Sequence, residues 1–314
     1  MNSRRTFITT TSLASAAFLT GINGALAAGF SPVQTKRNIY IFSKHLQWLD
    51  YNGMAKTACE VGFDGIDLTV RPKGHVLPER VKDDLPLAIE AIKSAGLLAN
   101  RMTTAITDAE DARTIDILET AAKLGVKHYR LGWLAYNKEL SIIQNIKVFN
   151  TKLKKLAELN KKLGLTAAYQ NHAGVMAGGP VWDMGLMLDE IDPTLVGIRY
   201  DIRHATVEGG TAWPLGMKFI ADKINSFDIK DFYWKENNGE WKPNNVPLGK
   251  GMVDFNQYFE MIKSHSIKGD FTLHLEYPIG GAEKGAGKLS CAPEDVIAAM
   301  KQDLNYLKKQ VQTL

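Results

Sequence analysis

The chain has 314 residues, 45% of them hydrophobic and 23% charged, and its formal net charge is +4. Residues 1–27 contain two arginines and no acidic residue, so the rest of the chain carries only +2, too little to indicate a nucleic-acid partner. Its two cysteines, Cys59 and Cys291, do not make a disulfide framework, and the length of residues 28–314 suits one large domain or two small ones.

The first 27 residues predict an export signal. Arg4 and Arg5 precede a long uncharged stretch, which ends in the small-x-small pattern Ala25–Ala27. The arginine pair favours the twin-arginine route, and an ordinary secretory signal is the alternative. We therefore expect a periplasmic or otherwise exported protein. Glycines interrupt the stretch, so a stable membrane anchor is not expected.

Residues 28–314 alternate short apolar runs with longer segments whose apolar residues recur at helical spacing. Eight runs predict strands: Ile39–Phe42, Gly65–Val70, Leu97–Met102, Lys127–Leu131, Thr166–Gln170, Val196–Asp201, Ile224–Ile229 and Phe271–Glu276. Eight strand–helix units of this total length favour a single (β/α)8 TIM barrel over a doubly wound open sheet. An open sheet for nucleotides would also need a glycine-rich turn after its first strand, and none is present.

In such a barrel, chemistry takes place where the strands end. Oxygen donors lie at or near the ends of the fifth to eighth strands: Gln170, Asp201, Asp228 and Glu276. Oxygen ligands suit Mn, Mg or Ca better than zinc. The four residues predict a divalent-metal site, at which the metal would polarise a sugar carbonyl and stabilise an enediolate.

Further polar and aromatic residues follow the same strands. His172, His204 and Lys230 are candidate catalytic groups, although each could instead be a structural histidine or a salt-bridged lysine. The candidate substrate contacts are Arg71 and His75 after the second strand, and Trp234 after the seventh, as a face for a sugar ring.

Six motifs occur in a fixed order along residues 37–310: Gly62–Leu68, Gln170–Gly174, Asp201–His204, Asp228–Asp231, Pro247–Phe255 and His274–Pro278. In order and spacing they resemble the xylose isomerase-like TIM barrels, a superfamily of sugar isomerases, epimerases and endonuclease IV. The resemblance implies a metal held by Glu, Asp, His and Glu. This chain matches at Asp201 and Glu276, but has Gln170 in place of Glu and Asp228 in place of His.

The two departures leave the number of ligand carboxylates at three, which favours a remodelled metal site over a barrel that has lost its metal. Related epimerases use their two glutamates as a pair of bases. Since Gln170 cannot accept a proton, Glu276 is the remaining base of that pair, unless His172 or His204 substitutes for the other.

The sequence thus predicts a metal-dependent sugar isomerase or epimerase that acts on an unphosphorylated sugar or sugar derivative. The alternatives are a lyase that acts on 3-keto-glycosides and a non-catalytic sugar-binding barrel. Nucleic-acid repair is disfavoured, because that branch of the superfamily builds a three-metal cluster from many histidines and this chain has seven. The oligomeric state stays open.

Overall fold

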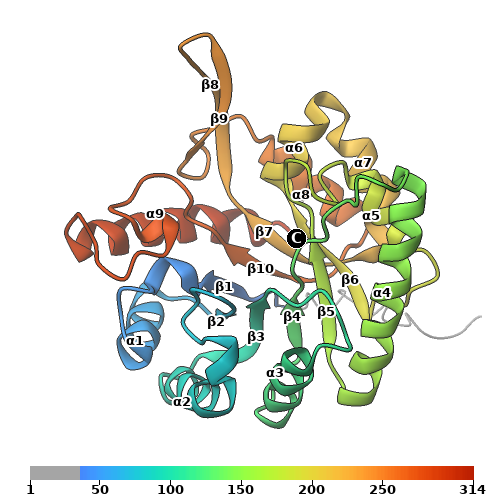
Figure 1. The fold of residues 1–314 in the computed structure, drawn as a ribbon. Coiled ribbons are helices and arrows are strands. Elements are labelled where there is room, and N and C mark those ends of the chain that lie inside the picture. The colour runs from blue at the N-terminus through green and yellow to red at the C-terminus, as the bar shows by residue number, and fades with distance from the viewer. Residues whose placement is uncertain (1–35) are drawn as a thin grey trace, which may run out of the picture. The chain divides into compact units, whose positions relative to one another are not determined.

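The computed structural model describes residues 36–314, so the predicted export signal lies outside the described residues. Residues 36–314 contain a closed barrel of parallel strands in the order β1-β10-β7-β6-β5-β4-β3-β2 (Figure 1). The predicted single (β/α)8 barrel is therefore confirmed. The barrel strands are β1 (Ile39–Phe42), β2 (Gly65–Val70), β3 (Leu98–Thr104), β4 (His128–Arg130), β5 (Thr166–Gln170), β6 (Val196–Asp201), β7 (Ile224–Ile229) and β10 (Asp270–Leu273).

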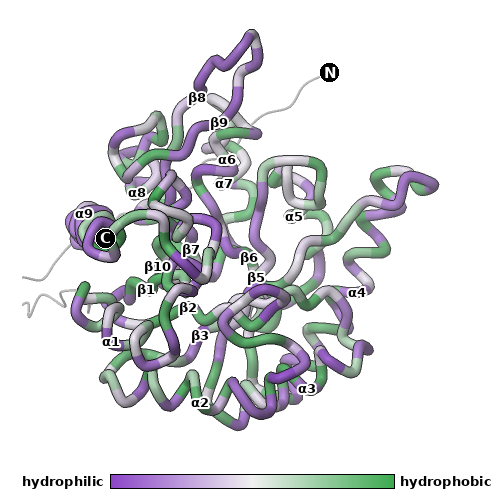
Figure 2. Tube along the Cα trace, turned by 60° about the vertical axis from the view of Figure 1, so that its left-hand side comes forward, coloured by the Kyte–Doolittle hydropathy of each residue, from purple (hydrophilic) through white to green (hydrophobic). Residues whose placement is uncertain are grey.

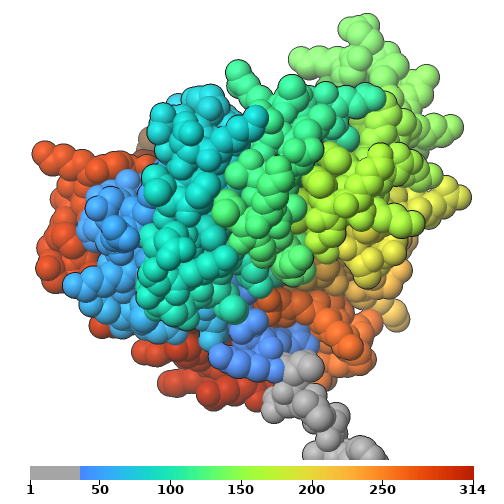
Figure 3. All heavy atoms as spheres, turned by 90° about the horizontal axis from the view of Figure 1, so that it is seen from below, coloured from blue at the N-terminus to red at the C-terminus, as the bar shows by residue number. Residues whose placement is uncertain are grey.

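Amphipathic helices surround the barrel: α1 (Tyr51–Val61), α2 (Val81–Ser94), α3 (Ala112–Lys123), α4 (Ile142–Leu163), α5 (Val181–Met187), α6 (Ile202–Gly209), α7 (Trp213–Phe219), α8 (Phe255–Ser264) and α9 (Pro293–Val311). Short 3-10 turns are η1 (Ser43–Leu46), η2 (Pro78–Arg80), η3 (Gly210–Ala212), η4 (Ala221–Lys223) and η5 (Ala282–Lys284). Hydrophobic and hydrophilic residues alternate along the helices (Figure 2). Neighbouring segments lie side by side in chain order on the face that Figure 3 shows.

Local sequence signals fix where several helices begin and end. Ser141 and Gln144 form a capping box at the start of α4, which satisfies backbone N–H groups that have no partner within the helix. At the other end, Gly164 adopts a φ of 65°, which glycine tolerates without steric cost, and the chain turns directly into β5. In the described part of the chain, no helix is long and apolar enough to cross a membrane.

One element was not predicted. β8 (Asp231–Asn237) and β9 (Glu240–Val246) form an antiparallel hairpin that projects from the barrel, as Figure 1 and Figure 2 show. The last barrel strand is also shorter than the predicted Phe271–Glu276. Because β10 ends at Leu273, Glu276 lies in the loop that follows it.

Several charged side chains point into the barrel interior because side chains alternate between the two faces of a strand. Residues two apart on a strand point to the same face, so Arg199 and Asp201 on β6 share a side. Asp228 and Lys230, at the end of β7, share theirs in the same way. All four are almost fully buried, so the barrel core is polar at its carboxyl end.

Candidate functional site

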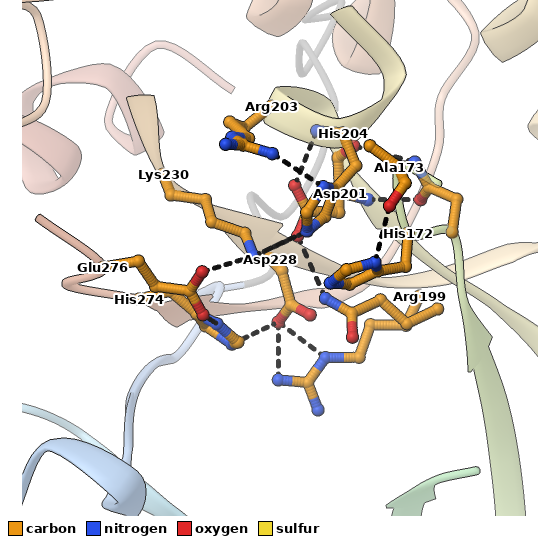
Figure 4. A network of polar contacts seen from close by, with 12 residues as sticks. His172, Ala173, Arg199, Asp201, Arg203, His204, Asp228, Lys230, His274 and Glu276 are labelled. Atoms are coloured by element: carbon orange, nitrogen blue, oxygen red, sulfur yellow. Dashed lines mark hydrogen bonds and ion pairs between the residues drawn. The ribbon is translucent and has the colours of Figure 1, made fainter. Parts of the chain in front are cut away.

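A lysine ammonium lies at the centre of the polar cluster (Figure 4). The Nζ atom of Lys230 lies 3.0 Å from Asp201 Oδ2, 3.4 Å from Glu276 Oε2 and 2.9 Å from His204 Nε2. Lys230 is only 3% exposed. Burial alone would lower the pKa of Lys230, but the carboxylates of Asp201 and Glu276 outweigh it and raise this pKa. Lys230 is therefore a buried cation that joins the end of β6 to the loop that follows β10.

Asp228 belongs to a second ion cluster deeper in the barrel. Its Oδ1 accepts a hydrogen bond from Arg199 Nε at 2.6 Å and lies 3.1 Å from His274 Nε2. Arg199 also lies 2.5 Å from Asp67 on β2, so one guanidinium holds two carboxylates. Burial would raise the pKa of Asp228, but Arg199 and His274 outweigh it and hold this pKa below its usual range.

Gln170 is held between a donor and an acceptor, which fixes the orientation of its amide. Arg130 donates to Gln170 Oε1 at 2.6 Å, and Gln170 Nε2 donates to Asp201 Oδ2 at 2.9 Å. Because a guanidinium can only donate, the oxygen must face Arg130. Asp201 Oδ2 therefore accepts hydrogen bonds from both Gln170 and Lys230.

Glu276 is the most exposed carboxylate of the cluster, with 23% of its side chain accessible. Its two oxygens face two ammonium groups, Lys44 at 3.1 Å and Lys230 at 3.4 Å. Burial would raise the pKa of Glu276, but Lys230 and then Lys44 outweigh it and hold this pKa well below its usual range. Glu276 is therefore an ionised carboxylate that is partly open at the barrel mouth.

His172 and His204 stack beside this centre, with ring centroids 4.0 Å apart. Burial and then Lys230 lower the pKa of His172 to about 4, and the same causes hold the pKa of His204 well below its usual range. Both imidazoles are thus neutral near pH 7. His172 Nδ1 lies 2.9 Å from the Ala173 carbonyl, which can only accept, so this nitrogen carries the proton. The Nε2 of His172 therefore keeps its lone pair.

The three predicted substrate residues are placed differently from one another. Arg71 is half-buried over the Phe42 ring, at 5.3 Å, and is close enough to Asp67 and Glu276 to feel their charges. In contrast, both ring nitrogens of His75 are bonded to the protein itself, to Ser43 at 3.1 Å and to the Leu46 carbonyl at 3.2 Å. The structure therefore gives His75 a structural role.

Trp234, the third of these residues, lies on the hairpin strand β8 rather than in a loop over the site. Its ring packs edge-on against Phe232, with centroids 5.9 Å apart, and the residue is 37% exposed. No contact joins it to Lys230 or Glu276 among the described residues.

The residues present do not fit the predicted divalent metal. Within residues 36–314, no group of three His, Cys, Asp or Glu side chains is arranged to hold a metal ion. The predicted ligands do lie near one another, but each has an oxygen bound to a cationic side chain: Gln170 to Arg130, Asp228 to Arg199, and Asp201 and Glu276 to Lys230. The assignment of these four residues as metal ligands therefore stays a prediction, and the structure shows that each of them is paired with a cationic side chain.

Five residues to which the sequence interpretation assigned no catalytic, metal or substrate role complete the cluster: Lys44, Asp67, Arg130, Arg199 and His274. A signal for two of them was present. Arg199 lies two residues before Asp201, and His274 two before Glu276, the spacing that places both members of each pair on one face.

Residues 55–310 match the sequence family described as the xylose isomerase-like TIM barrel. The chain belongs to this family. No curated protein matches the sequence of this chain significantly.

Solved structures of similar fold include sugar epimerases. The apo 3-keto-D-glucoside 4-epimerase YcjR from E. coli is 17% identical, with a TM-score of 0.61 over 87% of this chain and 100% of that one. A D-allulose 3-epimerase from Methylomonas sp., solved with D-allulose, is 16% identical, with a TM-score of 0.62 over 88% and 98%. A xylose isomerase-like barrel from Mycobacterium smegmatis, solved with magnesium, is 12% identical, with a TM-score of 0.64 over 89% and 98%.

Proposed function

We propose that this protein is an isomerase or epimerase that acts on an unphosphorylated sugar or sugar derivative, by removing a proton next to a carbonyl. The observation that carries the proposal is Glu276: an ionised, partly accessible carboxylate at the barrel mouth, between two ammonium groups. The epimerases of the same fold support the sugar class. The predicted export signal supports a substrate outside the cytoplasm, where sugar phosphates are rare.

The proton transfer can be written with the residues present. A Glu276 oxygen takes the proton from the carbon beside the carbonyl, the C–H electron pair forms a C=C bond, and the carbonyl pair moves to oxygen. The resulting enediolate oxygen is stabilised by N–H donors of Lys230. Return of the Glu276 proton to the former carbonyl carbon, with transfer of the hydroxyl proton between the two oxygens, gives the isomer. Delivery of a proton to the original carbon by a second group on the opposite side gives the epimer.

Epimerisation needs a second group that can hold a proton. The free Nε2 lone pair of His172 supplies one, because its Nδ1 proton is held by the Ala173 carbonyl. This arrangement supports the exception in the sequence-based prediction, in which a histidine substitutes for the missing glutamate.

Deuterium exchange tests the proposal even where the product is unidentified. The protein is incubated in D2O with a free ketose and with a 3-keto-glucoside, and NMR follows the C–H groups beside the carbonyl. We expect enzyme-dependent deuterium incorporation there with at least one substrate. Release of the glycosidic group would assign the lyase reaction instead. Sugar binding without exchange in either substrate would overturn the proposal and indicate a binding barrel.

A further inference from the structure

The two ligand positions at which this chain departs from the pattern of its family are each bound by an arginine. Gln170 Oε1 accepts from Arg130, and Asp228 Oδ1 accepts from Arg199. Arg130 and Arg199 are 4% and 1% exposed, so both arginines are built into the barrel interior. A metal at this place would have to compete with buried guanidinium groups for both oxygens.

The two positions that keep the family carboxylates are joined by Lys230. Its Nζ lies 3.0 Å from Asp201 Oδ2 and 3.4 Å from Glu276 Oε2. A divalent ion bound to both oxygens would lie about 2.0–2.6 Å from each, and so would overlap the ammonium group. Lys230 is 3% exposed and its ammonium occupies the space between the two carboxylates, so a metal could bind there only by displacing it.

The cluster also contains hydrogen-bond donors that lack an acceptor, whereas a cation site needs free acceptors, of which Asp228 Oδ2 is one among the described residues. His204 Nδ1 lies 3.0 Å from Arg203 Nη1, and His204 Nε2 lies 2.9 Å from Lys230 Nζ. A neutral imidazole accepts through only one nitrogen, so one of these two cationic groups has a donor left over. Arg130 Nε is likewise buried without an acceptor among the described residues. An oxyanion would satisfy such donors, and a metal ion would not.

We propose that the ammonium of Lys230 takes the place of the divalent cation in this protein. It holds Asp201 and Glu276 together in the ground state and donates to the enediolate oxygen during proton transfer, so the protein needs no divalent metal. The catalytic part of this inference rests on the proposed function, but the exclusion of metal does not.

Metal titration in the absence of sugar tests the exclusion. The protein is dialysed against a chelator, its metal content is determined, and Mn²⁺ binding is followed by calorimetry and by Tm. We expect substoichiometric metal and no Mn²⁺-dependent rise in Tm for the wild type. Lys230→Met removes the ammonium and leaves Asp201 and Glu276 without it, so Mn²⁺ should bind at least about tenfold tighter and raise Tm. Lys242→Met, on the exposed hairpin, is the matched control and should behave as the wild type.

Two results would overturn the inference. One is stoichiometric Mn²⁺ binding with a rise in Tm of the wild type. The other is an absence of any gain in Mn²⁺ affinity in both Lys230→Met and the more polar Lys230→Gln, which serves if the first variant does not fold. Failure of the proposed function can be told apart from failure of this inference. An absence of deuterium exchange would count against the proposed function, whereas the metal titration is done without sugar and does not depend on that result. Exchange that requires added metal would contradict the inference and leave the proposed function intact.

Discussion

At the scale of single residues, Arg199 is the ion-pairing group with the largest structural consequence. It is 1% exposed and pairs with both Asp67 and Asp228. Arg199→Met would leave two buried carboxylates without their cation, which should lower the free energy of unfolding by about 3–5 kcal/mol. Urea denaturation measures this. The control Arg80→Met removes an exposed pair with Asp84 and should leave the midpoint near that of the wild type. Equal midpoints for the two variants would contradict the assignment.

Glu276 carries the proposed proton transfer, and its amide variant separates chemistry from folding. Glu276→Gln keeps the shape of the side chain and one acceptor oxygen but cannot take a proton. We expect the rate of deuterium exchange to fall by about 100-fold or more, with a near-UV circular dichroism spectrum unchanged from the wild type. A variant with normal spectrum and near-normal exchange would assign the base to another residue, with His172 next to be tested.

At the scale of elements, the hairpin β8–β9 is tied to the loop that follows it through Asp231. The carboxylate of Asp231 accepts hydrogen bonds from the backbone N–H groups of Phe232, Gly249, Gly251 and Val253. A Cβ atom at Gly251 would collide with the Asp231 carboxylate and the Phe232 carbonyl. Gly251→Ala should therefore destabilise the fold by about 1–3 kcal/mol. Gly287→Ala, where nothing lies within 4 Å, is the control, and equal Tm values would refute the account.

The buried carboxyl group of Asp303 on α9 should make the free energy of unfolding depend on pH. Its carboxylate is buried, with the Leu248 N–H and the Tyr277 hydroxyl as donors, and burial raises its pKa to about 7. The unfolded value is about 3.9, so between these values the folded state binds more protons and stability falls as pH rises. Asp303→Asn removes this loss.

The free energy of unfolding of Asp303→Asn should therefore rise relative to that of the wild type as pH increases from about 5 to about 8, by on the order of 1–3 kcal/mol. Urea denaturation at several pH values measures this difference. Asp116→Asn, a half-exposed position paired with Lys82, is the control and should show no such gain. A pH-independent difference between wild type and Asp303→Asn would mean that the carboxyl does not titrate in this range.

The sequence predicted the barrel because each strand and helix carries its own periodic pattern, and seven of the eight strand predictions overlap the observed bounds closely. The hairpin β8–β9 was not predicted, because its strands are mostly exposed and polar. Asn238 and Gly239, both with positive φ, nevertheless mark a tight turn between them. The site was predicted in part, since strand ends locate Lys230 and Glu276. The cations that pair with Glu276 and Gln170 come from strands distant in sequence: Lys44 follows β1, and Arg130 ends β4. Only the closed barrel brings them together.

At the scale of the whole molecule, the buried cluster at the barrel mouth carries a net positive charge. Residues 28–314 have a formal charge of only +2, yet the cluster itself holds an excess of two positive charges, with histidines left aside. Six cations face four carboxylates there: Lys44, Arg71, Arg130, Arg199, Arg203 and Lys230 against Asp67, Asp201, Asp228 and Glu276. Such a field attracts anions into the barrel mouth.

The excess charge predicts a preference for sugars that carry a carboxylate. Arg71 is half-buried near Glu276, and its guanidinium makes no hydrogen bond to any described residue. Of these cations it is therefore the one best able to form an ion pair with a substrate carboxylate. D-glucuronate should therefore raise Tm more than D-glucose at equal concentration, and added salt should reduce the difference. Arg71→Gln should reduce it as well, because it removes one charge, whereas Lys242→Gln on the distant hairpin tip should not. Equal shifts for the two sugars at low salt would show that the positive charge only balances the buried carboxylates, and that the substrate is neutral.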